Sequence, residues 1–150
     1  MADSEKPISS FSDEEKAAIR KRCLEGISER EGAVKYSVDQ VGGEDHLTER
    51  IDLLVWVYND RAEIEKYRET IRFIDGEENV DWEKISWVLD TFRQRERLYR
   101  GIAENTRRII EENIYNEDKL REETERANEW KTALDALTRE TLKRQPEGKA

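Results

Sequence analysis

No proline occurs between Pro7 and Pro146. Proline lacks a backbone N–H donor and clashes with the preceding helical turn, so long helices exclude it from their interiors. Apolar residues in the same stretch recur at intervals of three and four residues, which is the spacing of one face of a helix. The sequence therefore predicts an all-α fold: an elongated antiparallel helical bundle with long, coiled-coil-like helices.

Capping and turn residues divide this stretch into four helices. Ser12 and Glu15 have the spacing of a capping box, Gly42 and Gly43 suit a helix end and a turn, and Asp81 is a good N-cap. We predict one helical domain over residues 12–144, with disordered tails at residues 1–11 and 145–150. Its helices are expected at about 12–31, 44–74, 82–115 and 117–143.

The end of the first helix is open to two interpretations. Gly26 and Gly32 weaken the helical pattern, each by up to about 1 kcal/mol relative to alanine. We expect the helix to break near Glu31 and a looser segment to continue to Val41. A short hairpin over residues 34–38 is the alternative.

The boundary between the third and fourth helices is also open. Asn116 is a good N-cap, and Tyr115 with Leu120 has the spacing of a hydrophobic staple, which favours a break. Alternatively, one helix runs unbroken from Trp82 to about Lys143. The two possibilities differ in whether the chain reverses direction near residue 115.

Six consecutive large apolar side chains, from Leu53 to Tyr58, interrupt a chain in which 42% of residues are charged. Successive side chains on a helix lie about 100° apart, so this run covers every side of its helix. Two offset stripes overlap there. They are Leu47, Ile51, Leu54 and Tyr58, and Val57, Ile64, Ile71 and Ile74.

We expect the run to be enclosed by the first and third helices and by a second copy of the chain. A strand is also compatible with Val, Trp and Tyr, but no second run of this kind could pair with it. The residues that we predict at an interface with a partner or a second copy are Leu53, Trp56, Val57, Trp87, Leu98 and Trp130.

Charge is distributed unevenly along the chain, whose net charge is −9. Residues 44–81 carry twelve acidic and five basic side chains, and an arginine cluster follows them. One interpretation is that the two segments lie antiparallel and that their charges pair. The other is that the cluster forms a charged patch for a phosphate group or an acidic partner. The cluster comprises Arg93, Arg95, Arg97 and Arg100.

The residues that usually carry catalysis or bind metals are scarce. The chain has one histidine, His46, and one cysteine, Cys23, so a zinc site of the usual Cys/His type cannot form within one chain. No Gly-rich phosphate loop and no Glu-x-x-His pair occurs. Cys23 lies on the apolar face of its helix and is expected to pack as a small hydrophobe. We predict no catalytic residues, no metal and no cofactor.

One short segment resembles a known enzyme family. Arg50, Ile51 and Asp52, followed by the apolar run and Arg61, are similar to the first helix of the all-helical chorismate mutases. The resemblance covers about twenty residues. It would imply a site in which arginines, a lysine and polar residues from packed helices hold a dicarboxylate. At the position of that lysine this chain has Arg72.

These observations predict a non-enzymatic protein-interaction protein: an adaptor, assembly or regulatory subunit that acts as a homodimer and contacts another protein. One alternative is a small acidic inhibitor or regulator of a nucleic-acid-processing complex, and another is a small helical enzyme of mutase type. No segment has the features of a signal peptide or the length of a membrane span. We therefore expect a soluble, cytoplasmic protein that binds neither membranes nor nucleic acid.

Overall fold

A computed structural model describes residues 11–43, 46–113 and 117–146, and for residues 110–113 it describes the backbone alone. Within these ranges all regular structure is helical and no strand occurs. The predicted all-α antiparallel bundle is confirmed. The four helices are α1 (Asp13–Gly43), α2 (Leu47–Ile74), α3 (Trp82–Asn113) and α4 (Glu117–Arg144).

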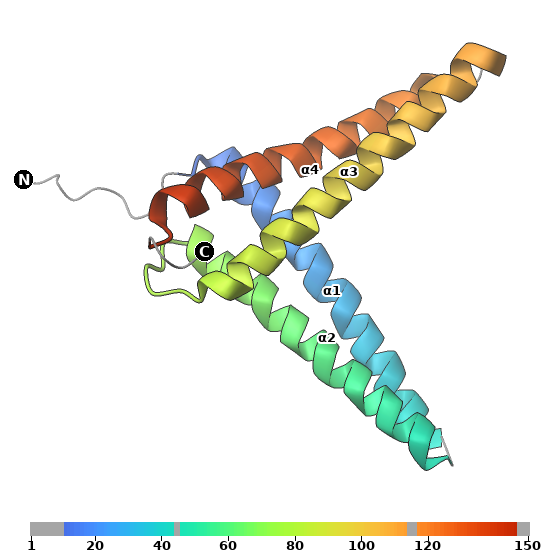
Figure 1. Ribbon diagram of the computed structural model, residues 1–150, viewed down its shortest axis with the longest axis vertical. Coiled ribbons are helices and arrows are strands. Elements are labelled where there is room, and N and C mark those ends of the chain that lie inside the picture. The colour runs from blue at the N-terminus through green and yellow to red at the C-terminus, as the bar shows by residue number, and fades with distance from the viewer. Residues whose placement is uncertain (1–10, 44–45, 114–116, 147–150) are drawn as a thin grey trace, which may run out of the picture.

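The helices form two hairpins that diverge in the shape of a V (Figure 1). In one hairpin α1 packs along α2, and in the other α3 packs along α4. The hairpins meet where α1 begins, α2 ends, α3 begins and α4 ends; we call this region the vertex. The parts of the hairpins that extend beyond it are the α1–α2 arm and the α3–α4 arm. Each arm is therefore only two helices thick.

The hydrophobic core lies at the vertex. It contains the largest fully buried side chains, which come from all four helices: Ile19, Phe73, Ile74, Ile85, Val88, Phe92 and Leu137. Cys23 is buried among them, as its place on the apolar face predicts. Phe11, which the sequence places in the N-terminal tail, is also buried and packs edge-on against Phe73. Of the predicted tails, residues 1–10 and 147–150 lie outside the described residues, and residues 145 and 146 directly follow the end of α4.

Local sequence signals set the helix ends. The capping box is present, because the Glu15 N–H donates to Ser12 Oγ at 3.1 Å and the Ser12 N–H donates to Glu15 Oε1 at 3.0 Å. Asp81 Oδ1 accepts from the Glu83 N–H at 3.0 Å at the start of α3. Gly76 has a φ of 106°, a conformation that favours glycine, in the turn between α2 and α3. The starts of α1 and α3 and the turn between α2 and α3 therefore lie where the sequence predicts them.

The predicted break near Glu31 is wrong, because α1 runs continuously to Gly43. The second half of α1 packs along α2, where Arg30 contacts Glu63 and lies 3.9 Å from Asp60. Contacts of this kind along a helix pair outweigh the modest propensity cost of two glycines. The hairpin alternative at residues 34–38 is wrong for the same reason.

The chain reverses direction between α3 and α4, since α4 returns along α3 (Figure 1). One unbroken helix from Trp82 to Lys143 is therefore excluded. Tyr115 and Asn116, the residues predicted to mark the break, lie outside the described residues. The apolar positions predicted on α4 are buried or half-buried, including Ala127, Trp130 and Leu137.

Ion pairs join the helices at the vertex. Arg139 of α4 donates to both carboxylate oxygens of Glu15, each at 2.8 Å. Arg20 contacts Asp75 beyond the end of α2, and Arg22 contacts Glu129 of α4. Glu15 therefore takes part both in the cap of α1 and in the contact between α1 and α4.

We expect Glu15 to make stability depend on acidity. The hydrogen bonds from Arg139 and from the Ser12 backbone lower the pKa of Glu15 from 4.5 to about 2. A carboxyl group with a lowered pKa in the folded state stabilises that state above its unfolded pKa, and the stabilisation is lost as pH falls through the folded pKa. The free energy of unfolding should therefore fall between about pH 4.5 and 2. Because the pair is accessible to solvent, its share should not exceed about 1 kcal/mol.

The measurement is urea unfolding across that pH range for the wild type and for Glu15→Gln. The variant should lose less stability on acidification than the wild type. Glu14→Gln is the matched control, since Glu14 is the exposed neighbouring residue, and it should behave as the wild type does. Equal losses in all three proteins would show that the Glu15–Arg139 pair does not act in this way.

Candidate protein-interaction surface

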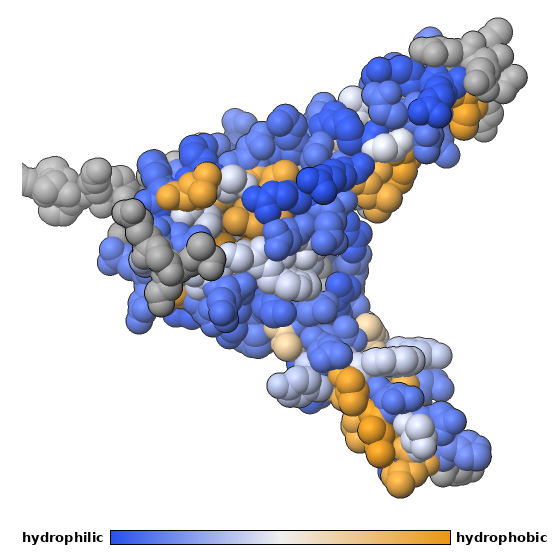
Figure 2. All heavy atoms as spheres, in the orientation of Figure 1, coloured by the Kyte–Doolittle hydropathy of each residue, from blue (hydrophilic) through white to orange (hydrophobic). Residues whose placement is uncertain are grey.

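The α1–α2 arm exposes large apolar side chains that belong mainly to α2. Figure 2 shows hydrophobic side chains gathered along this arm. Leu47, Ile51, Leu54 and Tyr58 are each 51–74% exposed, and we call these four residues the α2 stripe. Their spacing of four, three and four residues places them within roughly 60° of one another on the helix. Such a stripe has the form of a coiled-coil seam that lacks its partner helix.

Three of the four residues in the second predicted stripe of α2 are buried, and Ile71 is half-buried. Val57 and Ile64 are each 5% exposed and pack on the side of α1. Leu53 is half-buried. The helix therefore uses one stripe to build the hairpin and leaves the other in water.

The expectation that the third helix covers residues 53–58 is wrong. α3 diverges from α2 toward the other arm (Figure 1), and Leu54, Val55, Trp56 and Tyr58 stay exposed. The physical reason is the position of the core, which joins α2 to α3 only near the C-terminal end of α2. Coverage of residues 53–58 by a second copy of the chain stays a prediction.

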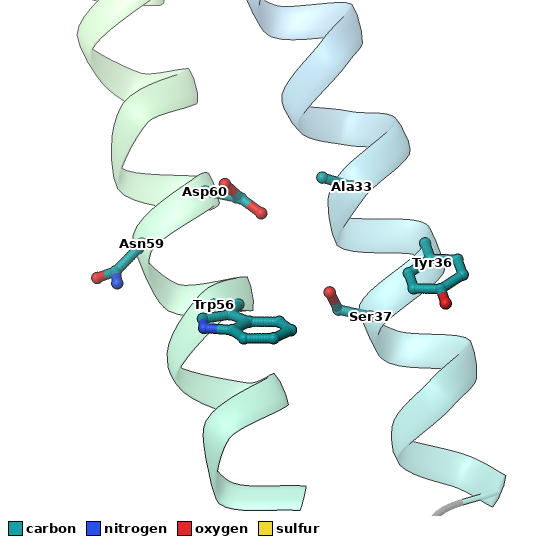
Figure 3. Close-up of a pocket in the computed structure, with 6 residues that line it drawn as sticks. All are labelled: Ala33, Tyr36, Ser37, Trp56, Asn59 and Asp60. Carbon is teal, nitrogen blue, oxygen red and sulfur yellow. The ribbon is translucent and has the colours of Figure 1, made fainter. Parts of the chain in front are cut away.

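Trp56 lines a shallow pocket of about 460 Å³ between α1 and α2. In Figure 3 its indole ring extends across the groove toward Ser37, while the Tyr36 ring points away from it on the outer side of α1. Ala33 and Ser37 are small residues on the α1 side of this groove, and Asp60 closes one end. The pocket adds an aromatic wall to the apolar arm surface.

Besides Leu53, the other five predicted interface residues range from exposed to buried. Trp56 and Leu98 are 57% and 52% exposed, so both are accessible to a partner. Val57 and Trp130 are buried within the chain. Trp87 is half-buried, with the Tyr67 ring 5.5 Å away and the Lys66 ammonium over its own ring. Trp130 therefore packs within the fold, and Trp87 is partly covered by side chains of the same chain.

The α2 stripe is evident in the sequence pattern but is not among the six predicted interface residues. The spacing of these residues was the available signal. It could not show which of the two stripes would face α1, because both consist of four large apolar residues on the same helix. Tyr36 and Val38 of α1 add to the exposed apolar surface and were also missed.

The arginines of the predicted patch pair mostly with acidic residues of their own helix, α3. Arg93 Nη1 lies 2.7 Å from Asp90 Oδ1, and Arg100 Nε lies 3.0 Å from Glu96 Oε2. Arg95 Nη2 lies 3.7 Å from Glu29 Oε1 of α1. The interpretation that these arginines pair with the acidic residues of α2 is therefore wrong, because the two helices diverge. Arg97 is exposed on the surface of α3.

The residues weighed for chemistry do not assemble into one site. Cys23 is buried at the vertex, and burial raises the pKa of its thiol. α1 continues for twenty residues beyond it before the arm tip where His46 lies, roughly 30 Å along the helix. Arg50 and Arg72, named in the resemblance to chorismate mutases, are separated by 22 residues of α2, or roughly 33 Å. Across the described ranges, no group of three or more His, Cys, Asp or Glu side chains is placed to hold a metal ion.

Comparisons with protein-family models, with curated proteins and with solved structures gave no match for this chain. Among the helices that the structure describes, none combines the length and the apolar character that crossing a membrane requires.

Proposed function

We propose that this chain is a non-enzymatic protein-interaction protein, an adaptor, assembly or regulatory subunit, that acts as a homo-oligomer through its α1–α2 arm. The α2 stripe is the observation that carries the proposal. Single exposed apolar residues are common on protein surfaces, but a contiguous stripe with heptad spacing on one helix usually marks a binding face.

The energetics of the arm support this proposal. Fully burying one large apolar side chain is worth roughly 1.5–3 kcal/mol, so the four residues of the α2 stripe represent a substantial free energy that the single chain does not use. The arm has only two helices, and each residue of the stripe that a partner covers adds to its stability. A helix from a partner is the element whose side-chain spacing matches the stripe.

Substitution of the stripe tests the proposal. The wild type is expected to show a light-scattering mass that is a multiple of the 17.8 kDa chain, and Leu54→Glu with Tyr58→Glu should reduce it to that of one chain. The helical content should not change, because substitutions at exposed sites usually alter stability by about 0.5 kcal/mol or less. Leu142→Glu is the matched control, since Leu142 is 77% exposed outside the stripe, and it should keep the wild-type mass.

High salt separates this proposal from a regulator that binds by charge. An oligomer held by apolar contacts should keep its light-scattering mass as the salt concentration rises. Attraction between exposed charges is instead screened beyond about 10 Å at 0.1 M salt, so a complex held by charge should dissociate. A wild-type protein that has the mass of one chain at every concentration and salt level would refute the homo-oligomer.

A further inference from the structure

The α3–α4 arm also carries an apolar stripe that the described part of the chain leaves exposed or half-buried. Leu98 and Ile109 are 52% and 47% exposed, and Ile102 between them is half-buried. We call these three residues the α3 stripe. Trp87 lies eleven residues before Leu98, at nearly the same angle on the helix, and is covered by Tyr67 of α2. The α3 stripe is thus the continuation of the face that packs on α2, beyond the point where the two helices part.

The two stripes lie on segments of opposite charge. From residue 93 to residue 109, α3 contains six arginines and two glutamates. Four of these arginines already have acidic partners: Arg93 pairs with Asp90, Arg95 with Glu29, Arg100 with Glu96 and Arg107 with Glu104. From residue 47 to residue 60, α2 contains Glu49, Asp52 and Asp60 against a single arginine, and Asp60 lies 3.9 Å from Arg30 of α1. Pairing α2 with α3 of another copy would therefore bring opposite net charges together, whereas pairing α2 with α2 would bring two net-acidic segments together.

Both arms expose large apolar side chains. Among the described residues of the two arms, ten such side chains are each 47–74% exposed, and six of them belong to the α2 and α3 stripes. A reciprocal contact uses both stripes of each copy, and a standard interface uses about 800 Å² from each partner. Figure 2 shows hydrophobic side chains on both arms in one view.

We propose that two copies of this chain associate reciprocally, with the α2 stripe of each copy packed on the α3 stripe of the other. This inference rests on the proposed function and specifies the contact through which the homo-oligomer forms. In a twofold-symmetric dimer, a contact between residue i and residue j of the partner is repeated between j and i. One arrangement therefore covers both stripes at once and closes the assembly at two chains.

Cross-linking of single-cysteine substitutions tests this arrangement. Leu54→Cys and Leu98→Cys each place one accessible thiol on one stripe, while the native Cys23 is fully buried. One of the two variants carries a tag that changes its mass. The two proteins are mixed, allowed to exchange subunits and treated with a short bismaleimide, and the products are separated by mass. Leu142→Cys, at an exposed site outside both stripes, replaces Leu98→Cys in the control mixture.

The expected result is a cross-linked pair of one tagged and one untagged chain in the mixture of Leu54→Cys and Leu98→Cys, and loss of that product in the control mixture. A dimer in which Leu54→Cys cross-links mainly to itself would overturn the reciprocal arrangement and leave the proposed homo-oligomer standing. A dimer that gives no cross-link between the two stripes would overturn the arrangement in the same way. A wild-type protein with the mass of one chain would instead refute the proposed function.

Discussion

Replacing Phe73 with alanine is expected to lower the free energy of unfolding by about 3–5 kcal/mol, the usual cost of a large cavity in a well-packed core. Phe73 is 1% exposed at the vertex. Its ring packs edge-on against Phe11 at 5.8 Å and Trp82 at 5.2 Å, and the Arg144 guanidinium lies 4.8 Å above it. Neighbours from several segments converge on this ring, so no single side chain can move to fill the space.

Urea unfolding followed by circular dichroism measures this loss, which is a large part of the 5–15 kcal/mol that a typical domain has. Leu142→Ala is the control, because Leu142 is a large apolar residue near the same end of the hairpins but is exposed. It should change stability by no more than about 0.5 kcal/mol. Similar losses for both variants would contradict the assignment of the core to the vertex.

Replacing Gly26 with alanine is expected to destabilise the fold although alanine favours helices. A Cβ atom at residue 26 would lie 2.3 Å from Tyr67 Cζ and 2.5 Å from Tyr67 Cε2. Tyr67 is buried and its ring packs edge-on against Trp87, so it cannot move away without disturbing a second aromatic ring. Overpacking of this kind costs about 1–3 kcal/mol, which exceeds the gain in helix propensity of about 1 kcal/mol or less.

Gly32→Ala is the matched control for this prediction. It makes the same change six residues later on the same helix, where a Cβ atom would have no neighbour within 4 Å. The control should raise the free energy of unfolding by about 0.5–1 kcal/mol. Gly26→Ala should also cost less when Tyr67→Leu removes the end of the ring. If both glycine variants stabilise the protein, α1 and α2 do not approach each other as closely as the structure shows.

These two glycines show where the sequence stops being informative. Both weaken a helical pattern to the same extent, and from this we predicted a break in the first helix. The structure gives them different roles, because Gly26 lies at the contact with Tyr67 and Gly32 faces open space. That difference depends on what lies opposite each residue, which the local pattern does not contain.

The candidate site shows the same division. The spacing of residues 47–74 predicted two stripes on α2, and both are present. Packing against α1 determines which stripe is buried, since α1 covers Val57 and Ile64. Arg93 and Arg100 pair with acidic residues of α3 itself. The acidic segment of α2 lies in the other arm, which diverges from α3.

By itself, the sequence determined the helical class, the capping residues and the angular position of each apolar stripe. These properties follow from spacings of three to eleven residues along one helix, which are local. Only the tertiary structure decided that the hairpins diverge, and therefore that Leu54, Tyr58 and Leu98 remain in water. The direction of each hairpin is set by packing at the vertex, where residues as far apart in sequence as Phe11 and Phe73 pack together.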